Sequence, residues 1–584
     1  MKTRAAAAIV AVAAVAAYWG ALSSGFVGDD FMILHRLREA GGLPGAGRFF
    51  RGEFFEYYRP MGFVLHAADW SAAGPDPWHF HLTNVLIHAL NSVLVFLIAR
   101  ELSPKTIAAP LAGLLFALHA SNHEAVVWIS ARFDLLATAF SLAAIWLTMR
   151  WPARSGSTIA AALLFLCAVL SKESAVALPI AAAGFFVFAR GATTREAVWR
   201  VVPWLAALLT YSVLRHLAGG VSAVGGTTRI PKLIAFLVVL VGVLLLGNER
   251  WRSVQRTLRG RPAVLLGTSF AALAVAGAIA AIGGRLGRLV AEKLAVSGFA
   301  LFNLGSPWLD VFDVPFYLSP GTTAYWLGGV IAIAIALLVL ALAWRTLVDD
   351  ERAWFLFAFL IAALLPISAL TEGARYLYLP SAAFALIVGV IVGELPAHGR
   401  RLAVAACALL IAISTAQIVV KVRDWQWAGR LTADGARMVD SALAPSCGEG
   451  QVVFLTQPVA IRSVYTHFLY ETFELPRGCM PGVFQILIRM VRIDTHVDVR
   501  WSDASTVEIT APNYRGNFVL SSDLRNFTVP LPATARVTLT TPLGLLQTEP
   551  ALNAMRITMH LSDSVRRDRA AFFYYSDGRI QLAR

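Results

Sequence analysis

Charged residues are scarce in this sequence, which excludes an ordinary soluble globular protein. Only 15% of the 584 residues are Asp, Glu, Lys or Arg, whereas soluble domains carry about 25%. Hydrophobic residues make up 57% of the chain, and the mean hydropathy is +0.64. A chain this apolar has too few polar side chains to cover itself in water, so its composition predicts a membrane protein.

Cysteine is equally scarce, and the four cysteines carry little functional information. Cys167 and Cys407 lie within apolar runs and are predicted to be packing residues. Cys447 and Cys479 lie in a polar C-terminal region. If that region is outside the cytoplasm, the two cysteines either form a disulfide or remain unpaired thiols. Their spacing alone does not decide between these alternatives.

A concentrated basic patch is also missing, although the formal net charge is +14. The basic residues are spread over short loops between apolar runs, and aromatic residues do not interleave with them as in a nucleic-acid-binding strip. Loops rich in Lys and Arg face the cytoplasm in membrane proteins, and segment 249–261 is the most arginine-rich of these loops. The sequence therefore excludes nucleic acid as a partner and predicts that this loop is cytoplasmic.

Long apolar runs predict a mainly α, polytopic membrane protein of about 13 transmembrane helices. About 20 apolar residues cross a bilayer as a helix, and lipid offers no partner to backbone groups outside one. The basic loops predict a cytoplasmic N-terminus and an external C-terminus, provided that 284–322 holds only a re-entrant or interfacial helix. The predicted helices are 5–22, 82–100, 106–119, 126–149, 157–171, 174–190, 200–217, 231–248, 262–283, 323–344, 353–370, 377–394 and 401–420.

The first apolar run resembles a signal peptide, because Lys2 and Arg4 precede a stretch rich in Ala and Val. We favour a retained helix, which would hold the polar residues that follow it at the membrane surface. A long external loop is expected over 23–81, within a transmembrane domain that spans 1–425.

Beyond residue 440 the pattern changes to short alternating runs, which are typical of β-strands separated by polar turns. These runs predict a β-rich extracytoplasmic domain over 440–584, which is an ordinary size for a domain. The expected strands are 451–456, 496–501, 506–510, 517–520, 537–540, 556–560 and 571–575.

Two adjacent carboxylates, Asp29 and Asp30, follow the first apolar run. Paired carboxylates at a membrane boundary suit a general base or ligands of a divalent cation such as Mg²⁺ or Mn²⁺. Solvation of a helix end explains them equally well, because an aspartate at a membrane boundary costs little. The residues alone leave both interpretations open.

A second group of polar residues surrounds the start of the next apolar run. Arg59 lies in the sequence Tyr-Tyr-Arg-Pro, and His81, Asn84 and His88 recur at a helical spacing that puts them on one face. His88 alone is explained more simply as a hydrogen-bonded core histidine. A complete polar stripe inside a membrane, however, needs partners or a water-filled cavity.

A third group follows the run 106–119. His119, His123 and Glu124 crowd one turn, and Arg132 and Asp134 are expected about two turns into the next helix. The two histidines have the i, i+4 spacing of metal ligands, but the sequence fixes no third ligand. Arg132 and Asp134 are expected either to line a site or to form a local ion pair with each other.

Two further charged turns complete the set. Lys172 and Glu173 separate two apolar runs, and Arg375 with Tyr376 and Tyr378 begins another. Arginine and tyrosine donors suit a phosphate. The simpler explanation of Lys172 and Glu173 is a charged hairpin at the surface. The simpler explanation of the Arg375 turn is an interfacial aromatic anchor with an arginine that reaches toward water. All five groups fall on the same predicted face of the membrane, which favours one site able to bind a phosphate and deprotonate a hydroxyl.

The order of these motifs resembles a known family. The chain reads, in order, Asp-Asp, Tyr-Arg-Pro-Met, His-Leu-Thr-Asn-Val-Leu-Ile-His, Leu-Phe-Ala-Leu-His, Ser-Ala-Arg-Phe-Asp, Leu-Ser-Lys-Glu-Ser and Ala-Arg-Tyr-Leu-Tyr-Leu-Pro. This series is similar to the membrane part of the GT-C superfamily of polyprenyl-phosphate-sugar-dependent glycosyltransferases, above all to the transmembrane-and-tetratricopeptide-repeat O-mannosyltransferases. The likeness covers about 20–180 and 370–385.

The resemblance implies an inverting transfer from a polyprenyl-phosphate-linked sugar to an extracytoplasmic acceptor, which is a protein, a lipid or a glycan. It implies that Asp29 or Asp30, with Asp29 favoured, is the base or a metal ligand. By position and charge, it assigns the lipid phosphate to Arg59, Lys172 and Arg375. The expected location is a bacterial inner membrane, with the site and the C-terminal domain facing the periplasm.

Two departures from the family pattern limit what the resemblance implies. Ala120 follows His119 where relatives often have proline, and a β-rich domain stands in place of the repeats, so the acceptor cannot be carried over. A transporter or flippase of lipid-linked saccharides is an alternative, although such proteins usually contain internal repeats and none is recognised here. A non-catalytic membrane assembly protein is a second alternative.

Overall fold

The computed structural model describes residues 2–53, 57–152, 155–219, 236–247, 252–253, 350–366, 374–442 and, with gaps of which 466–482 is the longest, 451–583. By internal contacts it divides into two compact units, Met1–Leu22 with Ala40–Val422, and Ser23–Glu39 with Arg423–Arg584. The predicted helices 262–283 and 323–344, the segment 284–322, Cys447 and Cys479 all lie outside the described residues.

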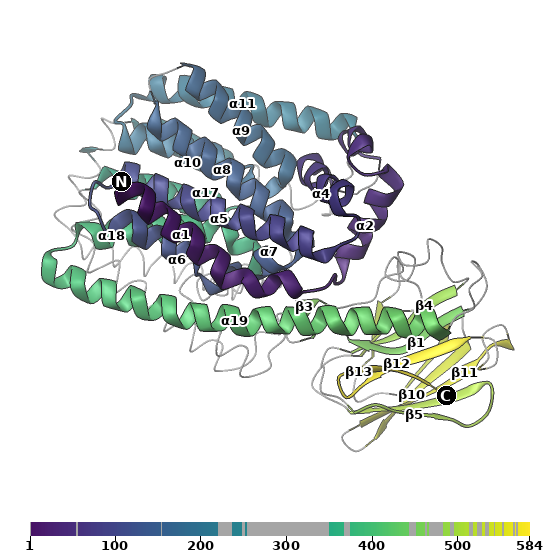
Figure 1. Cartoon of the computed structure of the whole chain (residues 1–584). Coiled ribbons are helices and arrows are strands. Elements are labelled where there is room, and N and C mark those ends of the chain that lie inside the picture. Colours follow the sequence, from purple (N-terminus) through teal and green to yellow (C-terminus); the bar gives the residue numbers. More distant parts are fainter. Residues whose placement is uncertain are drawn as a thin grey trace. The chain divides into compact units, whose positions relative to one another are not determined.

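The first unit is helical, and its helices pack mainly on neighbours that are close in sequence. They include α1 (Lys2–Tyr18), α3 (Gly47–Phe50), α4 (Pro60–Ala73), α5 (Pro77–Leu102), α6 (Ala108–Ala117), α7 (His123–Val127), α8 (Arg132–Arg150), α9 (Ser155–Ser171), α10 (Leu178–Gly184), α11 (Thr194–Leu217), α17 (Glu351–Leu364) and α18 (Tyr378–Glu394). Helix α5 packs against α1, α6 and α8, while α9 packs against α8 and α11 (Figure 1). Helix α18 closes on α6 and α17.

Six helices of the described residues are long and apolar enough to cross a membrane. The prediction of a helical membrane protein is therefore confirmed, whereas the count of 13 spans is not. Several predicted spans are shorter than a crossing requires. Helix α6 has 10 residues, about 15 Å of helix, against a hydrocarbon core of about 30 Å.

The predicted helix 126–149 is wrong in its first turn. Trp128 has an extended backbone, so helix α7 ends before it and α8 begins only at Arg132. Arg132 and Asp134 consequently lie in the first turn of α8, not two turns inside a helix. The predicted helix 174–190 is also divided, into a 3₁₀ turn, helix α10 and a π-helical turn at Phe185–Ala189.

Helix α19 (Ala397–Ala442) continues well past the predicted end at residue 420. The apolar run ends there, but Trp425, Ala428, Leu431 and Val439 remain buried at a near-helical spacing. The helix therefore changes from an apolar to an amphipathic pattern, with its residues from Arg423 onward belonging to the second unit.

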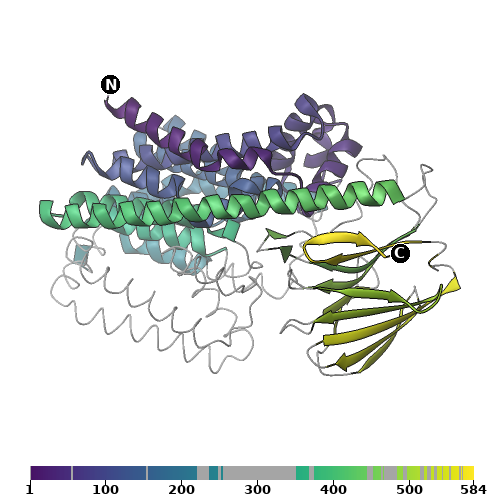
Figure 2. The ribbon, with the colours of Figure 1, turned by 60° about the horizontal axis from the view of Figure 1, so that its bottom comes forward.

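The described part of the second unit contains two larger β-sheets that face each other (Figure 2) and a two-stranded sheet of β2 (Ala460–Ile461) and β3 (Val464–Tyr465). All seven predicted strands are confirmed, and the structure adds others. In the described residues one sheet has the order β13-β12-β1-β4-β7-β8 and the other the order β5-β6-β11-β10-β9. Their bounds are β1 (Gln451–Pro458), β4 (Val483–Met490), β5 (Asp498–Trp501), β6 (Thr506–Pro512), β7 (Phe518–Ser521), β8 (Thr528–Leu531), β9 (Val537–Thr541), β10 (Gly544–Ala551), β11 (Ala554–Leu561), β12 (Ala571–Ser576) and β13 (Arg579–Leu582).

Strand β1 shows how alternation builds this unit. Val453 and Leu455 face the core between the two sheets, while Val452 and Phe454 point to the opposite face and pack with Leu431 of α19. Strand β1 pairs in parallel with both β4 and β12. Because both faces of β1 are covered, its central residues 452–455 are all apolar, as expected for a buried central strand.

Candidate functional site

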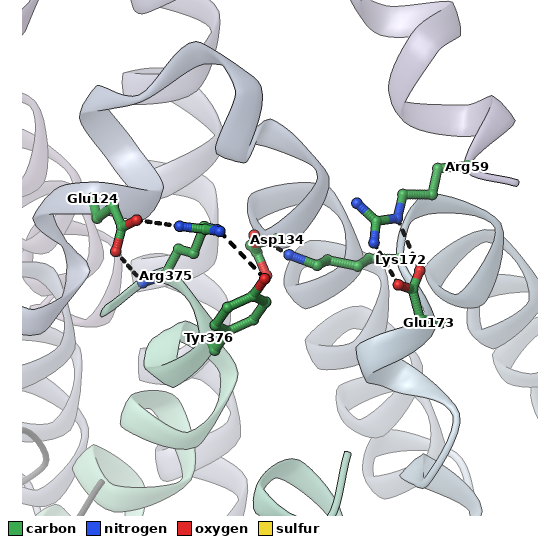
Figure 3. A network of polar contacts seen from close by, with 7 residues as sticks. All are labelled: Arg59, Glu124, Asp134, Lys172, Glu173, Arg375 and Tyr376. Atoms are coloured by element: carbon green, nitrogen blue, oxygen red, sulfur yellow. Dashed lines mark hydrogen bonds and ion pairs between the residues drawn. The ribbon is translucent and has the colours of Figure 1, made fainter. Parts of the chain in front are cut away.

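Three ion pairs form a chain of charges in the first unit (Figure 3). The Arg59 guanidinium donates to the Glu173 carboxylate through two nitrogens, Nε and Nη2. Lys172 Nζ lies 2.6 Å from Asp134 Oδ2. The Arg375 guanidinium and backbone N–H both donate to the Glu124 carboxylate. Side chains from four distant segments of the chain therefore meet in one polar network.

Tyr376 links two of these ion pairs, those of Lys172 and Arg375. Its hydroxyl lies 3.3 Å from Arg375 Nη2, and its ring centroid lies 4.6 Å from both Lys172 Nζ and Arg375 Cζ. Asp134 interacts electrostatically with all three cations. The network thus holds three positive and three negative charges around one tyrosine, and each cation retains N–H groups beyond those that bind its carboxylate.

Each member of the network lies at a helix end, which explains why the chain can collect charges beside apolar helices. Arg59 precedes Pro60 at the start of α4. Lys172 and Glu173 interrupt the chain between α9 and α10. Arg375 belongs to the 3₁₀ turn Ala374–Leu377 before α18. Charged groups cost less at helix ends than at the centre of a membrane.

Glu124 shows the electrostatic balance of the network. This residue lies in the short helix α7, outside the six apolar spans. Burial would raise the pKa of its carboxyl group, but the charge and the backbone N–H of Arg375 outweigh burial and hold the pKa below its usual value. Glu124 is therefore ionised when it pairs with Arg375.

The fully buried Arg132 does not join this network, and it does not pair with Asp134. Its Nε donates to Asn84 Oδ1 at 2.7 Å, and its Nη2 donates to the Phe80 carbonyl at 2.7 Å. Its Nη1 lies 2.6 Å from Asp69 Oδ2, an ion pair without the alignment of a hydrogen bond. Of the two alternatives for Arg132 and Asp134, a local ion pair between them is thus wrong, and Asp134 instead pairs with Lys172.

Several of the predicted polar residues are buried in hydrogen-bonded core positions. His88 binds the Tyr378 hydroxyl at 2.7 Å and the Ala117 carbonyl at 3.0 Å, and Asn91 also reaches that hydroxyl. His81, Asn84 and His88 are all buried on α5, as one shared face requires. The tyrosine at 378 therefore packs inside the helix bundle, whereas Tyr376 contacts the cations.

The histidines of the third group are engaged locally. His119 Nδ1 lies 2.7 Å from the Ser121 hydroxyl, and His123 Nδ1 lies 2.8 Å from the Ala120 carbonyl. Among the residues that the structure describes, no three His, Cys, Asp or Glu side chains gather as a metal site. Mg²⁺ often uses only one or two carboxylates and keeps its waters, so a cation at Asp29 and Asp30 stays a prediction.

Asp29 and Asp30 belong to the second unit and begin helix α2 (Asp29–Ala40). Asp30 is buried, and its Oδ2 accepts a hydrogen bond of 3.0 Å from the Val27 backbone N–H. Asp29 is partly exposed. The two carboxylates thus differ: Asp30 braces the turn before α2, while Asp29 retains access to solvent.

Sequence reasoning missed Asp69 and Phe133. Asp69 follows Ala-Ala in an apolar segment and carries no motif. Phe133 packs against Arg59, with its ring centroid 5.6 Å from the guanidinium carbon. A Cβ on Gly62 would come within 2.1 Å of the Phe133 ring. The glycine two residues after Arg-Pro was the available signal that something packs closely there.

Relatives with curated names share part of this sequence. Protein O-mannosyl-transferase Tmtc1 of Drosophila melanogaster is 31% identical over 175 residues, which cover 27% of this chain and 20% of the relative. Protein O-mannosyl-transferase TMTC3 of Mus musculus is 30% identical over 146 residues, 23% of this chain and 16% of the relative. The chain thus spans about a fifth of the length of these relatives. No family model matches.

The predicted resemblance to the transmembrane-and-tetratricopeptide-repeat O-mannosyltransferases is therefore confirmed in sequence. Among solved structures, the oligosaccharyltransferase AglB of Archaeoglobus fulgidus is similar, with a TM-score of 0.45 and 15% identity over 83% of this chain and 64% of that one. ArnT of Cupriavidus metallidurans follows, with a TM-score of 0.32 and 15% identity over 81% of this chain and 84% of that one.

Proposed function

We propose that this protein is a membrane glycosyltransferase of the GT-C type that transfers a sugar, with inversion, from a polyprenyl-phosphate carrier to an acceptor outside the cytoplasm. The observation that carries the proposal is the meeting of Arg59, Lys172 and Arg375 in one network beside apolar helices. The sequence similarity to named O-mannosyltransferases supports the reaction class, and the sugar and the acceptor stay undefined.

The network suits a lipid phosphate for two reasons. Arginine and lysine donate charge-assisted hydrogen bonds to phosphate oxygens, and each of the three cations still has donors beyond those that bind its carboxylate. The site also joins the ends of apolar helices, so a lipid carrier can reach it from the bilayer with its chain still in lipid. A water-soluble sugar nucleotide would gain nothing from that position.

In the proposed reaction Asp29 takes the proton of the acceptor hydroxyl. The acceptor oxygen attacks the anomeric carbon from the face opposite the carrier, and the bond from that carbon to the phosphate oxygen breaks. Its electron pair goes to the phosphate, whose charge rises from one to two, and the cations of the network stabilise that charge. Asp29 then returns its proton to water.

Asp29 is the better candidate for the base because its side chain is partly exposed. Asp30 is buried and holds the Val27 N–H, so its role is to keep the turn before α2 in shape. A divalent cation bound through the same pair would polarise the acceptor hydroxyl. The proposal stands with either form of activation, because in both cases the carboxylates act on the acceptor.

The test is sugar transfer in membranes with a radiolabelled polyprenyl-phosphate sugar. We expect Asp29→Asn to insert normally and to lose transfer by at least a hundredfold, a typical effect of removing a general base. Asp434→Asn, which changes an exposed carboxylate of α19, is the matched control and should retain transfer. Full transfer by the double variant Asp29→Asn/Asp30→Asn would refute the proposal.

A transporter of lipid-linked saccharides predicts a different result in the same membranes. It would move the intact labelled lipid between leaflets, and the label would stay in the lipid fraction with or without acceptor. A glycosyltransferase moves the label to the acceptor and leaves unlabelled carrier phosphate. Separation of the lipid and acceptor fractions therefore distinguishes the two functions.

A further inference from the structure

Helix α4 carries Arg59 at its first end and Asp69 nearly three turns further along. Asp69 joins three helices: its Oδ1 accepts a 2.8 Å hydrogen bond from Thr83 of α5, and its Oδ2 faces Arg132 of α8. Arg132 is itself fixed to α5 through Asn84 and the Phe80 carbonyl. We call Asp69, Thr83, Asn84 and Arg132 the α4 clamp.

The clamp continues directly into the candidate site. Arg132 is followed by Phe133, which packs against Arg59, and then by Asp134, which holds Lys172. Three consecutive residues at the start of α8 thus contact α4, the Arg59 side chain and the Lys172 side chain. Gly62 allows α4 to approach the Phe133 ring closely, because a Cβ at that position would lie only 2.1 Å from the ring.

We propose that Asp69 is a positioning residue that, through Arg132, fixes α4 so that Arg59 meets the carrier phosphate. The inference rests on the proposed function, because it gives Arg59 a ligand. Helix α4 is not among the six apolar spans of the described residues, so specific contacts, more than insertion into lipid, must set its place. A buried ion pair adds little net stability over an apolar pair of similar size, which agrees with a role in orientation.

A conservative substitution tests the positioning role. Asp69→Asn keeps the shape of the side chain and its hydrogen bond to Thr83, but it removes the charge that faces Arg132. We expect the purified full-length variant to bind undecaprenyl phosphate at least tenfold more weakly than wild type. In transfer assays the KM for the lipid donor should rise more than the KM for the acceptor.

The matched control is Glu394→Gln. Glu394 pairs with Arg352 at 3.3 Å, and Arg352 also holds the Leu102 carbonyl at the other end of α5. This variant likewise removes a partly buried carboxylate from an arginine that ties helices together. It should lower the thermal midpoint by less than Asp69→Asn does, because Arg352 keeps its ion pair with Asp350, and it should bind undecaprenyl phosphate within twofold of wild type.

Thr83→Val supplies a milder second variant in case Asp69→Asn does not fold. It removes only the hydroxyl donor to Asp69, and we expect two- to fivefold weaker binding. If wild type binds the lipid and both folded clamp variants bind equally well, the positioning role is overturned while the proposed function stands. If wild type itself does not bind undecaprenyl phosphate, the proposed function is overturned and this inference falls with it.

Discussion

The amino group of Lys172 lies 2.6 Å from Asp134 Oδ2, and the two side chains are only 4% and 5% exposed. Two buried charges in such contact depend on each other, because removal of one leaves the other unpaired in a medium of low polarity. Lys172 also contacts the Tyr376 ring, which extends its influence to Arg375. The pair therefore serves both the stability of the helix bundle and the charge of the candidate site, and the two roles can be separated.

Single and double substitutions should separate them. We expect Lys172→Met and Asp134→Leu each to lower the free energy of unfolding by about 3–5 kcal/mol, because each leaves a buried charge without its partner. The double variant should recover most of that loss. Transfer should stay abolished in the double variant, as in Lys172→Met, because both lack the Lys172 charge that the phosphate needs. Thermal unfolding in detergent and transfer assays give the two readouts, and a double variant that regained transfer would contradict the role of Lys172.

The sequence predicted much of the site, because its members stand at breaks between apolar runs. Lys172, Glu173 and Arg375 interrupt hydrophobic stretches, and a charge there stands out against its neighbours. Asp69 could not be found in this way, since its partner Arg132 lies 63 positions away and Asp69 itself belongs to no recognised motif. The alternative of a local pair between Arg132 and Asp134 fails because Trp128 ends α7, so that α8 begins only at Arg132 and its first side chains face other parts of the chain.

The β-rich unit was predicted well where strands are half buried, and less well where a strand is a continuous apolar run. Strands such as β6 and β11 alternate between core and surface, so period two is visible in the residues. The prediction missed β4, which reads Val-Phe-Gln-Ile-Leu-Ile-Arg-Met, because an apolar run of that length suits a helix as well as a strand. The part of α19 beyond residue 420 was missed because it is amphipathic. The prediction searched for apolar runs, and only the first part of this helix is one.

A methyl group at position 62 should disturb the site through Phe133. Gly62→Ala places a Cβ within 2.1 Å of the Phe133 ring, and such overpacking typically costs about 1–3 kcal/mol. In the double variant Gly62→Ala/Phe133→Leu the smaller leucine side chain leaves space for the new methyl group. We therefore expect the double variant to regain stability. Thermal unfolding of the two variants checks this, and a Gly62→Ala protein as stable as wild type would show that α4 can move away freely.

The ion pair of Glu124 with Arg375 predicts an acid-dependent loss of stability. Because the folded-state pKa of Glu124 lies below its usual value of about 4.5, the stabilising contribution is complete above that pH and is lost as the pH falls through the folded-state pKa. Glu124→Gln should therefore be less stable than wild type at pH 7, and the difference should narrow below pH 4.5. Unfolding curves at pH 3.5 to 7 measure it, and a difference independent of pH would contradict the assignment.

In the second unit, the segment before Asp29 depends on two glycines in contact. A Cβ on Gly429 of α19 would lie 2.5 Å from the Gly25 backbone nitrogen, and a Cβ on Gly25 would lie 3.1 Å from the Gly429 carbonyl oxygen. Ser23 accepts a hydrogen bond of 2.8 Å from Gln426 on the same helix. Because the obstacle is backbone, it cannot rotate aside as a side chain would, and α19 and residues 23–28 must separate to admit a methyl group.

We therefore expect Gly429→Ala to loosen the segment that leads to Asp29 and to reduce transfer at least tenfold, with little change in insertion. Gly399→Ala is the matched control on the same helix, because a Cβ there meets nothing within 4 Å. It should leave transfer unchanged and stabilise the helix slightly, since alanine is favoured over glycine within a helix by about 1 kcal/mol. Limited proteolysis gives a second readout, because cleavage within 23–39 should rise in Gly429→Ala alone. Equal cleavage and equal transfer in both variants would show that the contact of Gly25 with Gly429 does not hold Asp29 in place.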